Sequence, residues 1–291
     1  MHEALVVNRL ADARISASFQ AQLLDLVKQD DIASRQNWSF LIPAVAHALD
    51  PQKEAYVQPF AAVWGLLLAA LRRLDHLQDG HADDAPSPTR ASTSERYNLL
   101  LSYYLLATMV LDELDSDALP IGRLLRLRKL WADCLMRVAS GQQVDLELGH
   151  RIAPLSADLD LYQFVVQAKT GAFFTLAFGG TATLLTDDQV TINVLSDVGT
   201  VFGMLVQYGD DLADAATQPN PTITLPRSYH AQLAQHPYAN IHPSINAFWR
   251  FVYADYFRHV EQALSVLPIT VRSAIGHLFT STFGERLDEA A

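Results

Sequence analysis

Cysteine is almost absent from this 291-residue sequence, and its scarcity excludes two kinds of site. The single residue, Cys134, cannot build a disulfide framework or a cysteine-based metal site. Positive charge is also scarce, because 21 Lys and Arg stand against 32 Asp and Glu and leave a net charge of −11. Without a strong basic patch, the chain lacks the electrostatic footprint of a nucleic-acid-binding protein.

Long hydrophobic runs are missing as well. The densest, FAAVWGLLLAAL at 60–71, is well short of the roughly 20 residues that span a bilayer. The first residues, MHEALVVNRLADAR, lack the charged and then apolar layout of a signal peptide. We therefore expect a cytoplasmic protein with no transmembrane segment.

Strand-like alternation does not persist beyond a few residues, whereas helical periodicity is present almost throughout the chain. Apolar residues recur at spacings of three and four. They do so in 16–28, 56–78, 96–114, 121–138, 159–185, 189–212, 245–265 and 270–283. Ser92 with Glu95, and Thr186 with Gln189, have the spacing of a capping box and predict helix starts. With no repeat or long linker, the sequence predicts one all-α domain over residues 1–291.

Two pairs of aspartates stand at the ends of apolar helical stretches. Asp75 and Asp79 are four residues apart, as are Asp210 and Asp214. Carboxylates at this spacing share a helix face and repel each other by roughly 0.2–0.5 kcal/mol. Either each pair is a solvated helix end, or the two faces meet and hold a cation. Carboxylate oxygens with open coordination positions suit Mg²⁺ that substrate phosphates complete.

An ordered set of motifs carries a family resemblance over about residues 35–226. QYGDDLAD closely matches the pattern FQxxDDxxD, and DHLQD resembles a degraded first aspartate motif. The set comprises DHLQD at 75–79, RYNLLLSYYLLA at 96–107, GQQVD at 141–145, AKTGAFF at 168–174, QYGDDLAD at 207–214 and TLP at 224–226. In this order the motifs resemble the trans-isoprenyl diphosphate synthases of the polyprenyl synthetase superfamily. The resemblance implies the single-domain isoprenoid synthase fold, an antiparallel helix bundle around a central apolar pocket.

The resemblance also implies roles for individual residues and for a cofactor. It implies a prenyl diphosphate substrate, three Mg²⁺ ions bound with it, and a homodimer. Lys169 would bind the diphosphate, with Thr170 and Gln207 nearby as further catalytic residues; the alternatives are a surface lysine and a satisfied buried amide. The implied metal ligands are Asp75, Asp79, Asp210 and Asp214.

Departures from the family pattern point to a single diphosphate site. A chain-elongating synthase binds its second diphosphate with a G-K-R-x-R-P loop, but WSFLIP at 38–43 offers no cation there. The Arg-Arg pair that follows the first motif in the family is also missing. We therefore expect a class I terpene synthase that ionises one prenyl diphosphate. The alternatives are a prenyltransferase, either a polyprenyl diphosphate synthase or one with a non-diphosphate acceptor, and a non-catalytic synthase subunit.

Four positions are expected to contact the prenyl chain. In related synthases, bulky aromatics four and five residues before the first aspartate limit chain length, and Leu71 and Ala70 occupy those positions. The small Ala70 predicts a twenty-carbon substrate, linear or already cyclised. Tyr103 stands where the family usually has Asp, and Phe173 offers a π-face to a cation. Ordinary core packing is the alternative for each aromatic ring.

Overall fold

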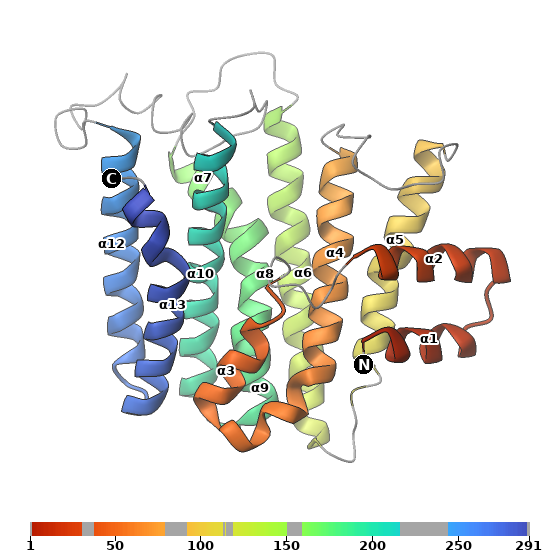
Figure 1. Cartoon of the computed structure of the whole chain (residues 1–291), viewed down its shortest axis with the longest axis horizontal. Coiled ribbons are helices and arrows are strands. Elements are labelled where there is room, and N and C mark those ends of the chain that lie inside the picture. The colour runs from red at the N-terminus through yellow and green to blue at the C-terminus, as the bar shows by residue number, and fades with distance from the viewer. Residues whose placement is uncertain are drawn as a thin grey trace. The chain divides into compact units, whose positions relative to one another are not determined.

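The computed structural model describes residues 2–30, 38–78, 92–112, 114, 119–149, 159–215 and 244–289. All regular secondary structure in these ranges is helical, which confirms the all-α prediction. The chain divides into two compact units, Met1–Leu124 and Leu125–Ala291, whose helices Figure 1 colours along the sequence. A single domain over 1–291 stays a prediction.

The first unit is built around two long helices that pack against each other. Its elements are α1 (His2–Asp12), α2 (Ala17–Gln29), α3 (Leu41–Leu49), the 3₁₀ helix η2 (Pro51–Val57), α4 (Gln58–Gln78) and α5 (Thr93–Leu111). Helix α4 lies along α5, while α1 and α2 also contact α5 (Figure 1). The stretch 60–70 of α4 is buried without interruption, as a helix that is apolar on every side must be.

In the second unit, the long helix α10 (Gln189–Ala215) lies beside a helical rod that two π turns interrupt. The rod runs through α7 (Leu159–Val166), η3 (Gln167–Gly171), α8 (Ala172–Thr175), η4 (Leu176–Gly180) and α9 (Thr181–Leu185), where η3 and η4 are π turns. The remaining helices are α6 (Ile121–Gly149, entering from the first unit), α12 (Ile245–Leu264) and α13 (Ile269–Glu289). Helix α10 contacts η3, α8, η4 and α12, and α12 contacts α13.

Glycines bring these helix backbones unusually close together. A Cβ atom on Gly203 of α10 would lie 2.7 Å from the Thr170 carbonyl oxygen, and one on Gly199 would lie 2.7 Å from that of Phe174. On α6, a Cβ on Gly141 would lie 2.6 Å from the Lys169 nitrogen. Only a residue without a side chain fits such approaches. Helices α6 and α10 therefore press directly on the backbone of Lys169 and Thr170.

The predicted helix starts had different outcomes. The capping box of α5 is confirmed, because Ser92 Oγ accepts from the Glu95 amide at 3.3 Å and Glu95 Oε2 accepts from the Ser92 amide at 2.7 Å. The prediction for α10 is wrong. There Asp188 caps the helix, since its carboxylate accepts from the amides of Val190 and Thr191 at 3.2 and 3.1 Å. Helices α1 and α3 were not predicted.

Two helical stretches, Pro51–Gln78 and Gln189–Ala213, are long and apolar enough by length and composition to cross a membrane. In each, 61% of the most apolar window is buried inside the folded chain. A core helix of a globular unit meets the same two criteria, and this burial fits that role.

Candidate active site

Lys169 lies in the π turn η3 and forms an ion pair within the second unit. Its Nζ donates to Asp145 Oδ2 of α6 at 3.1 Å, and the two side chains are 21% and 12% exposed. The GQQVD and AKTGAFF motifs are thus brought together, although 24 residues separate the paired side chains. An ammonium carries three N–H donors, so one bond to Asp145 leaves Lys169 with further donor capacity.

A chain of hydrogen bonds begins at the next residue. Thr170 Oγ1 donates to Gln207 Oε1 at 2.7 Å, and Gln207 Nε2 donates to Asp211 Oδ1 at 2.8 Å. The other Asp211 oxygen, Oδ2, accepts from the Tyr162 hydroxyl at 2.6 Å. Asp211 and Tyr162 are buried, whereas Thr170 and Gln207 are half-buried. The chain joins α7, η3 and α10 and ends beside Lys169.

The predicted metal ligands fall partly within the described residues. Asp75 is half-buried near the end of α4, and Asp210 is exposed on α10. Asp79 and the Asp214 side chain lie outside the described part. Within that part, no three His, Cys, Asp or Glu side chains gather as a metal site would require. The donor chemistry of Asp75 and Asp210 suits Mg²⁺, and the metal centre stays a prediction.

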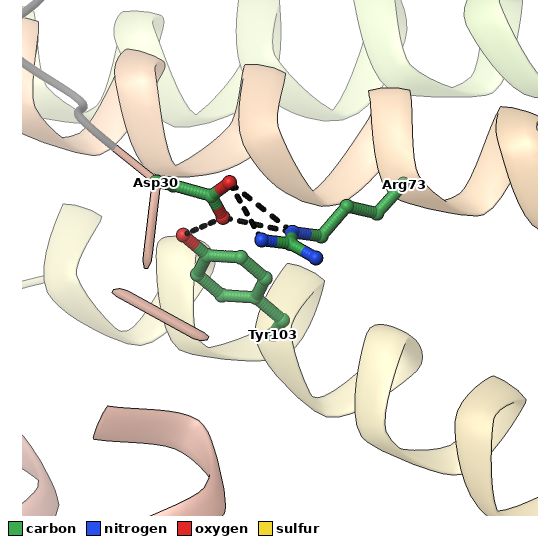
Figure 2. A network of polar contacts seen from close by, with 3 residues as sticks. All are labelled: Asp30, Arg73 and Tyr103. Carbon is green, nitrogen blue, oxygen red and sulfur yellow. Dashed lines mark hydrogen bonds and ion pairs between the residues drawn. The ribbon is translucent and has the colours of Figure 1, made fainter. Parts of the chain in front are cut away.

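A second polar network lies in the first unit (Figure 2). Asp30, at the C-terminal end of α2, accepts two bonds from Arg73 Nε, at 3.1 and 3.0 Å, and one from Arg73 Nη2 at 2.9 Å. The Tyr103 hydroxyl of α5 also donates to Asp30, at 3.1 Å. Arg73 and Asp30 side chains are only 12% and 18% exposed. Burial and the neighbouring Asp30 charge raise the pKa of Tyr103 well above its usual value.

The predicted chain-contacting residues lie on apolar helix surfaces in separate units. Ala70 is buried and Leu71 half-buried on α4, and the ring of Tyr103 is fully buried on α5. Phe173 on α8 is also buried and meets Phe174 edge-to-face, with ring centroids 5.8 Å apart. Such burial fits core packing as well as a pocket wall, so their contact with a prenyl chain stays a prediction.

The stretch expected to replace a cationic loop packs into the first unit. Ile42 is fully buried and Ser39 is 9% exposed, while the rings of Trp38 and Phe40 lie 6.0 Å apart. Trp38 has a φ of 55°, a left-handed conformation that side chains other than Gly adopt rarely. This segment therefore packs through apolar contacts, and the expectation that it binds no second diphosphate stays a prediction.

Sequence reasoning gave no role to five residues that the structure draws into these networks. Asp211 had a signal, because it is part of the QYGDDLAD motif. Asp145 had a signal, because it is the last residue of the GQQVD motif. Tyr162, Asp30 and Arg73 had none, since each meets its partner across 43 or more residues of sequence.

Comparison with known proteins bears on both the sequence and the fold. Residues 96–222 match the polyprenyl synthetase family model. This region contains Asp145, Tyr162, Lys169, Thr170 and the second aspartate motif. No curated protein sequence matches the chain significantly.

Solved structures resemble the fold over almost the whole chain. A geranylgeranyl pyrophosphate synthetase from the archaeon Geoglobus acetivorans is 16% identical, with a TM-score of 0.71 over 95% of this chain and 94% of that one. A T. brucei farnesyl diphosphate synthase is 15% identical, with a TM-score of 0.71 and coverages of 97% and 96%. A Rhodobacter capsulatus decaprenyl diphosphate synthase is 16% identical, with a TM-score of 0.64 and coverages of 98% and 95%. Residues 96–222 are thus similar to polyprenyl synthetases, and the chain has the isoprenoid synthase fold.

Proposed function

We propose that this protein is a Mg²⁺-dependent enzyme that binds one prenyl diphosphate and ionises its allylic C–O bond. The observation that carries the proposal is the meeting of Lys169 and Asp145 beside the Thr170–Gln207 hydrogen bond. A partly accessible ammonium next to an ordered polar chain suits an anionic substrate group. All four residues lie in one unit and in the region that matches the family model.

Charge neutralisation is the chemical role proposed for these residues. As the C–O bond breaks, negative charge builds on the leaving diphosphate, and Lys169 donates hydrogen bonds to it while Asp145 holds the ammonium in place. Carboxylates from the two aspartate motifs, among them Asp75 and Asp210, would hold Mg²⁺. The ions, when bound, supply further electrophilic stabilisation of the same leaving group.

Prenyl transfer is favoured over cyclisation as the fate of the prenyl cation. The similar solved structures bear the names of prenyl diphosphate synthases, which couple a prenyl group to an acceptor. Because residues 38–43 offer no cationic side chain, the proposed acceptor is not a second diphosphate. The same observation supports a second candidate, a class I terpene synthase in which the cation cyclises, loses a proton or captures water.

One assay separates these candidates. Purified protein is incubated with Mg²⁺ and ten-, fifteen- or twenty-carbon prenyl diphosphates, either alone, with isopentenyl diphosphate, or with an aromatic or peptide acceptor. The organic extract is analysed before and after phosphatase treatment. Hydrocarbon or alcohol without an added acceptor supports the terpene synthase. Elongated diphosphate supports a polyprenyl diphosphate synthase. Consumption of substrate only with an added aromatic or peptide acceptor supports the preferred proposal.

Metal dependence tests the shared first step. Chelation of Mg²⁺, or Asp210→Ala, is expected to lower turnover by orders of magnitude while circular dichroism reports an unchanged helical fold. An exposed aspartate away from the motif, Asp255, gives the matched control. Full activity in Asp210→Ala would contradict the site. No conversion of any prenyl diphosphate by wild type would leave the non-catalytic subunit as the remaining alternative.

Substrate length is proposed from α4. The small side chain of Ala70, next to Leu71, leaves room for a twenty-carbon chain, and Ala70→Phe would fill that space. Overpacking typically costs about 1–3 kcal/mol, enough to change a chain-length preference. The measurement is kcat/KM for fifteen- and twenty-carbon substrates in both proteins. A wild-type preference for the shorter one would rule out this pocket floor.

A cytoplasmic homodimer completes the proposal. Leu101 and Leu105, one turn apart on α5, are 56% and 49% exposed, and a second copy would cover such side chains. Sedimentation equilibrium of wild type and of Leu101→Glu tests it, with a shift of the variant to monomer as the expected result.

A further inference from the structure

We infer that Tyr162 and Asp211 are positioning residues that fix the Gln207 amide and so set the direction of the hydrogen bond made by Thr170. The inference rests on the proposed function, because it gives two residues a part in arranging that same site. A reading of the motif alone would group Asp211 with its neighbours as a metal ligand.

Burial and hydrogen bonding separate Asp211 from the exposed Asp210 that precedes it. Asp211 is 6% exposed, and both of its oxygens accept hydrogen bonds from side chains of the second unit. An ionised carboxylate has no hydrogen to donate, so both partners must be donors. Asp211 thus fixes which end of the Gln207 side chain faces it.

The amide orientation follows from this constraint. Gln207 must turn its NH₂ group toward Asp211 Oδ1, 2.8 Å away, which leaves its carbonyl oxygen 2.7 Å from Thr170 Oγ1. Reversing the amide would put two acceptor oxygens in contact at the Asp211 end, which leaves buried groups without the donors they need. Thr170 is therefore the donor, and its only hydrogen is committed to Gln207. Its oxygen presents lone pairs to whatever else approaches.

Tyr162 holds the far end of the chain in place. Its hydroxyl donates to Asp211 at 2.6 Å, and its ring is 1% exposed. The ring stacks on Tyr208 with centroids 5.5 Å apart, and Tyr208 in turn meets Trp249 edge-on at 6.0 Å. A ring packed on this aromatic column keeps one position, so the hydroxyl keeps Asp211 oriented.

A double-mutant cycle tests whether the chain acts as one unit. Tyr162→Phe keeps the stacked ring and removes the donor, while Thr170→Val removes the opposite end. Each is expected to lower kcat by about tenfold to a hundredfold, a size typical of lost positioning. The double variant should lose no more than the worse single variant, because either change already breaks the chain. A loss of kcat in the double variant that equals the product of the two single losses would overturn the inference.

The matched control is Tyr256→Phe. Tyr256 also neighbours Tyr208, with ring centroids 6.1 Å apart and hydroxyls 3.4 Å apart, but it is not part of the hydrogen-bond chain from Tyr162 to Thr170. Its loss of a hydroxyl should leave kcat unchanged. An equal loss in Tyr256→Phe would show that general packing around Tyr208 accounts for the effect, and would reject the positioning role.

Magnesium titration separates positioning from metal ligation. Asp211→Asn is expected to lower kcat and leave the Mg²⁺ concentration for half-maximal activity unchanged, whereas Asp210→Asn should shift it upward. An upward shift in Asp211→Asn as large as that in Asp210→Asn would assign Asp211 to the metal. If Tyr162→Phe fails to fold, Asp211→Asn replaces it in the cycle with Thr170→Val.

A readout without turnover keeps the two proposals distinguishable. The same cycle is measured on the denaturant midpoint of unfolding. If the effects of the two substitutions on the midpoint are non-additive in a protein that converts no prenyl diphosphate, the result would support the hydrogen-bond chain and reject only the proposed function. If the midpoint shifts of the two single variants add in the double variant, and their fold-losses of kcat multiply, the result would reject the hydrogen-bond chain and leave the proposed function intact.

Discussion

The two units each bury a carboxylate that a tyrosine hydroxyl and a second donor satisfy, yet they do so with different consequences. In the first unit, Asp30 binds the guanidinium of Arg73 and the hydroxyl of Tyr103. In the second, Asp211 binds the amide of Gln207 and the hydroxyl of Tyr162. In the first network the Arg73 guanidinium neutralises the Asp30 carboxylate. In the second network the hydrogen bonds continue from Asp211 through Gln207 to Thr170.

We infer from this difference that the Asp30 network holds helices together, whereas the Asp211 network positions residues of the candidate site. The Asp30 network joins α2, α4 and α5 around side chains that are at most 18% exposed. The Asp211 network ends at half-buried Thr170, next to a lysine whose side chain is 21% exposed. Damage to the first should therefore reduce stability, and damage to the second should reduce turnover.

Asp30→Ala should have the largest effect on stability. It leaves the Arg73 guanidinium buried without its carboxylate, and breaking such a pair typically costs about 3–5 kcal/mol of the free energy of unfolding. Chemical denaturation measures the change, with Asp255→Ala in the exposed pair with Arg258 as the control, expected to cost at most about 1 kcal/mol. Equal losses in the two variants would remove the distinction between the networks.

Lys169→Met should lower turnover and also cost stability, because it removes the ammonium partner of Asp145, whose side chain is 12% exposed. The substitution keeps the length of the side chain and removes the donors for the leaving group, so kcat should fall by roughly 10²–10³-fold, the scale of a lost oxyanion donor. Steady-state kinetics and thermal unfolding on the same preparation check both parts. A protein that unfolds at much lower temperature but turns over normally would assign Lys169 to structure.

Tyr103→Phe should cost about 1.5–3 kcal/mol of stability, the range for a hydrogen bond to a charged partner. It should also change the response to alkali. Because the pKa of Tyr103 is raised on folding, the stability linked to its proton is complete below about pH 10 and is lost as the pH rises above that. Unfolding free energies from pH 8 to 11 should fall less steeply in the variant, and equal slopes would contradict this account.

Two glycine substitutions give the smallest effects and opposite signs. Gly203→Ala would push a Cβ atom against the Thr170 carbonyl oxygen and cost about 1–3 kcal/mol through overpacking, with a loss of kcat as Thr170 moves. Gly276→Ala has nothing within 4 Å and should stabilise α13 by about 0.5–1 kcal/mol. Denaturation and kinetics on the pair check this, and an intact kcat in Gly203→Ala would separate backbone contact from function.

Much of the fold was predictable because helical periodicity records burial directly. The apolar run of α4 and the capping box at Ser92 were both identified from local spacing. Local rules failed where two caps competed, because the carboxylate of Asp188 accepts two amide hydrogens and takes the place expected for Thr186. The short helix α3 offered too few turns for a periodic pattern.

The candidate site was predictable only as far as its motifs reach. Lys169, Thr170 and Gln207 were found through resemblance, and the structure shows that the last two are hydrogen-bonded. Tyr162 stayed hidden, since nothing local to it indicates that its hydroxyl meets a carboxylate 49 residues away. Pairings of that kind are properties of the folded chain.

The π turns of the rod have a consequence for how this chain tolerates insertions and deletions. Lys169 and Thr170 lie in η3, and η4 follows four residues after it ends. A π turn accommodates one residue more than the α-helical hydrogen-bonding pattern requires. Deleting one residue from η4 would therefore restore regular helix and leave α9 close to its orientation relative to η3, whereas a deletion in regular α-helix rotates the residues after it by about 100°. The rod can thus lose one residue at η4 and still turn its apolar face toward its neighbours, so the π turn is a position at which the length of the rod can change.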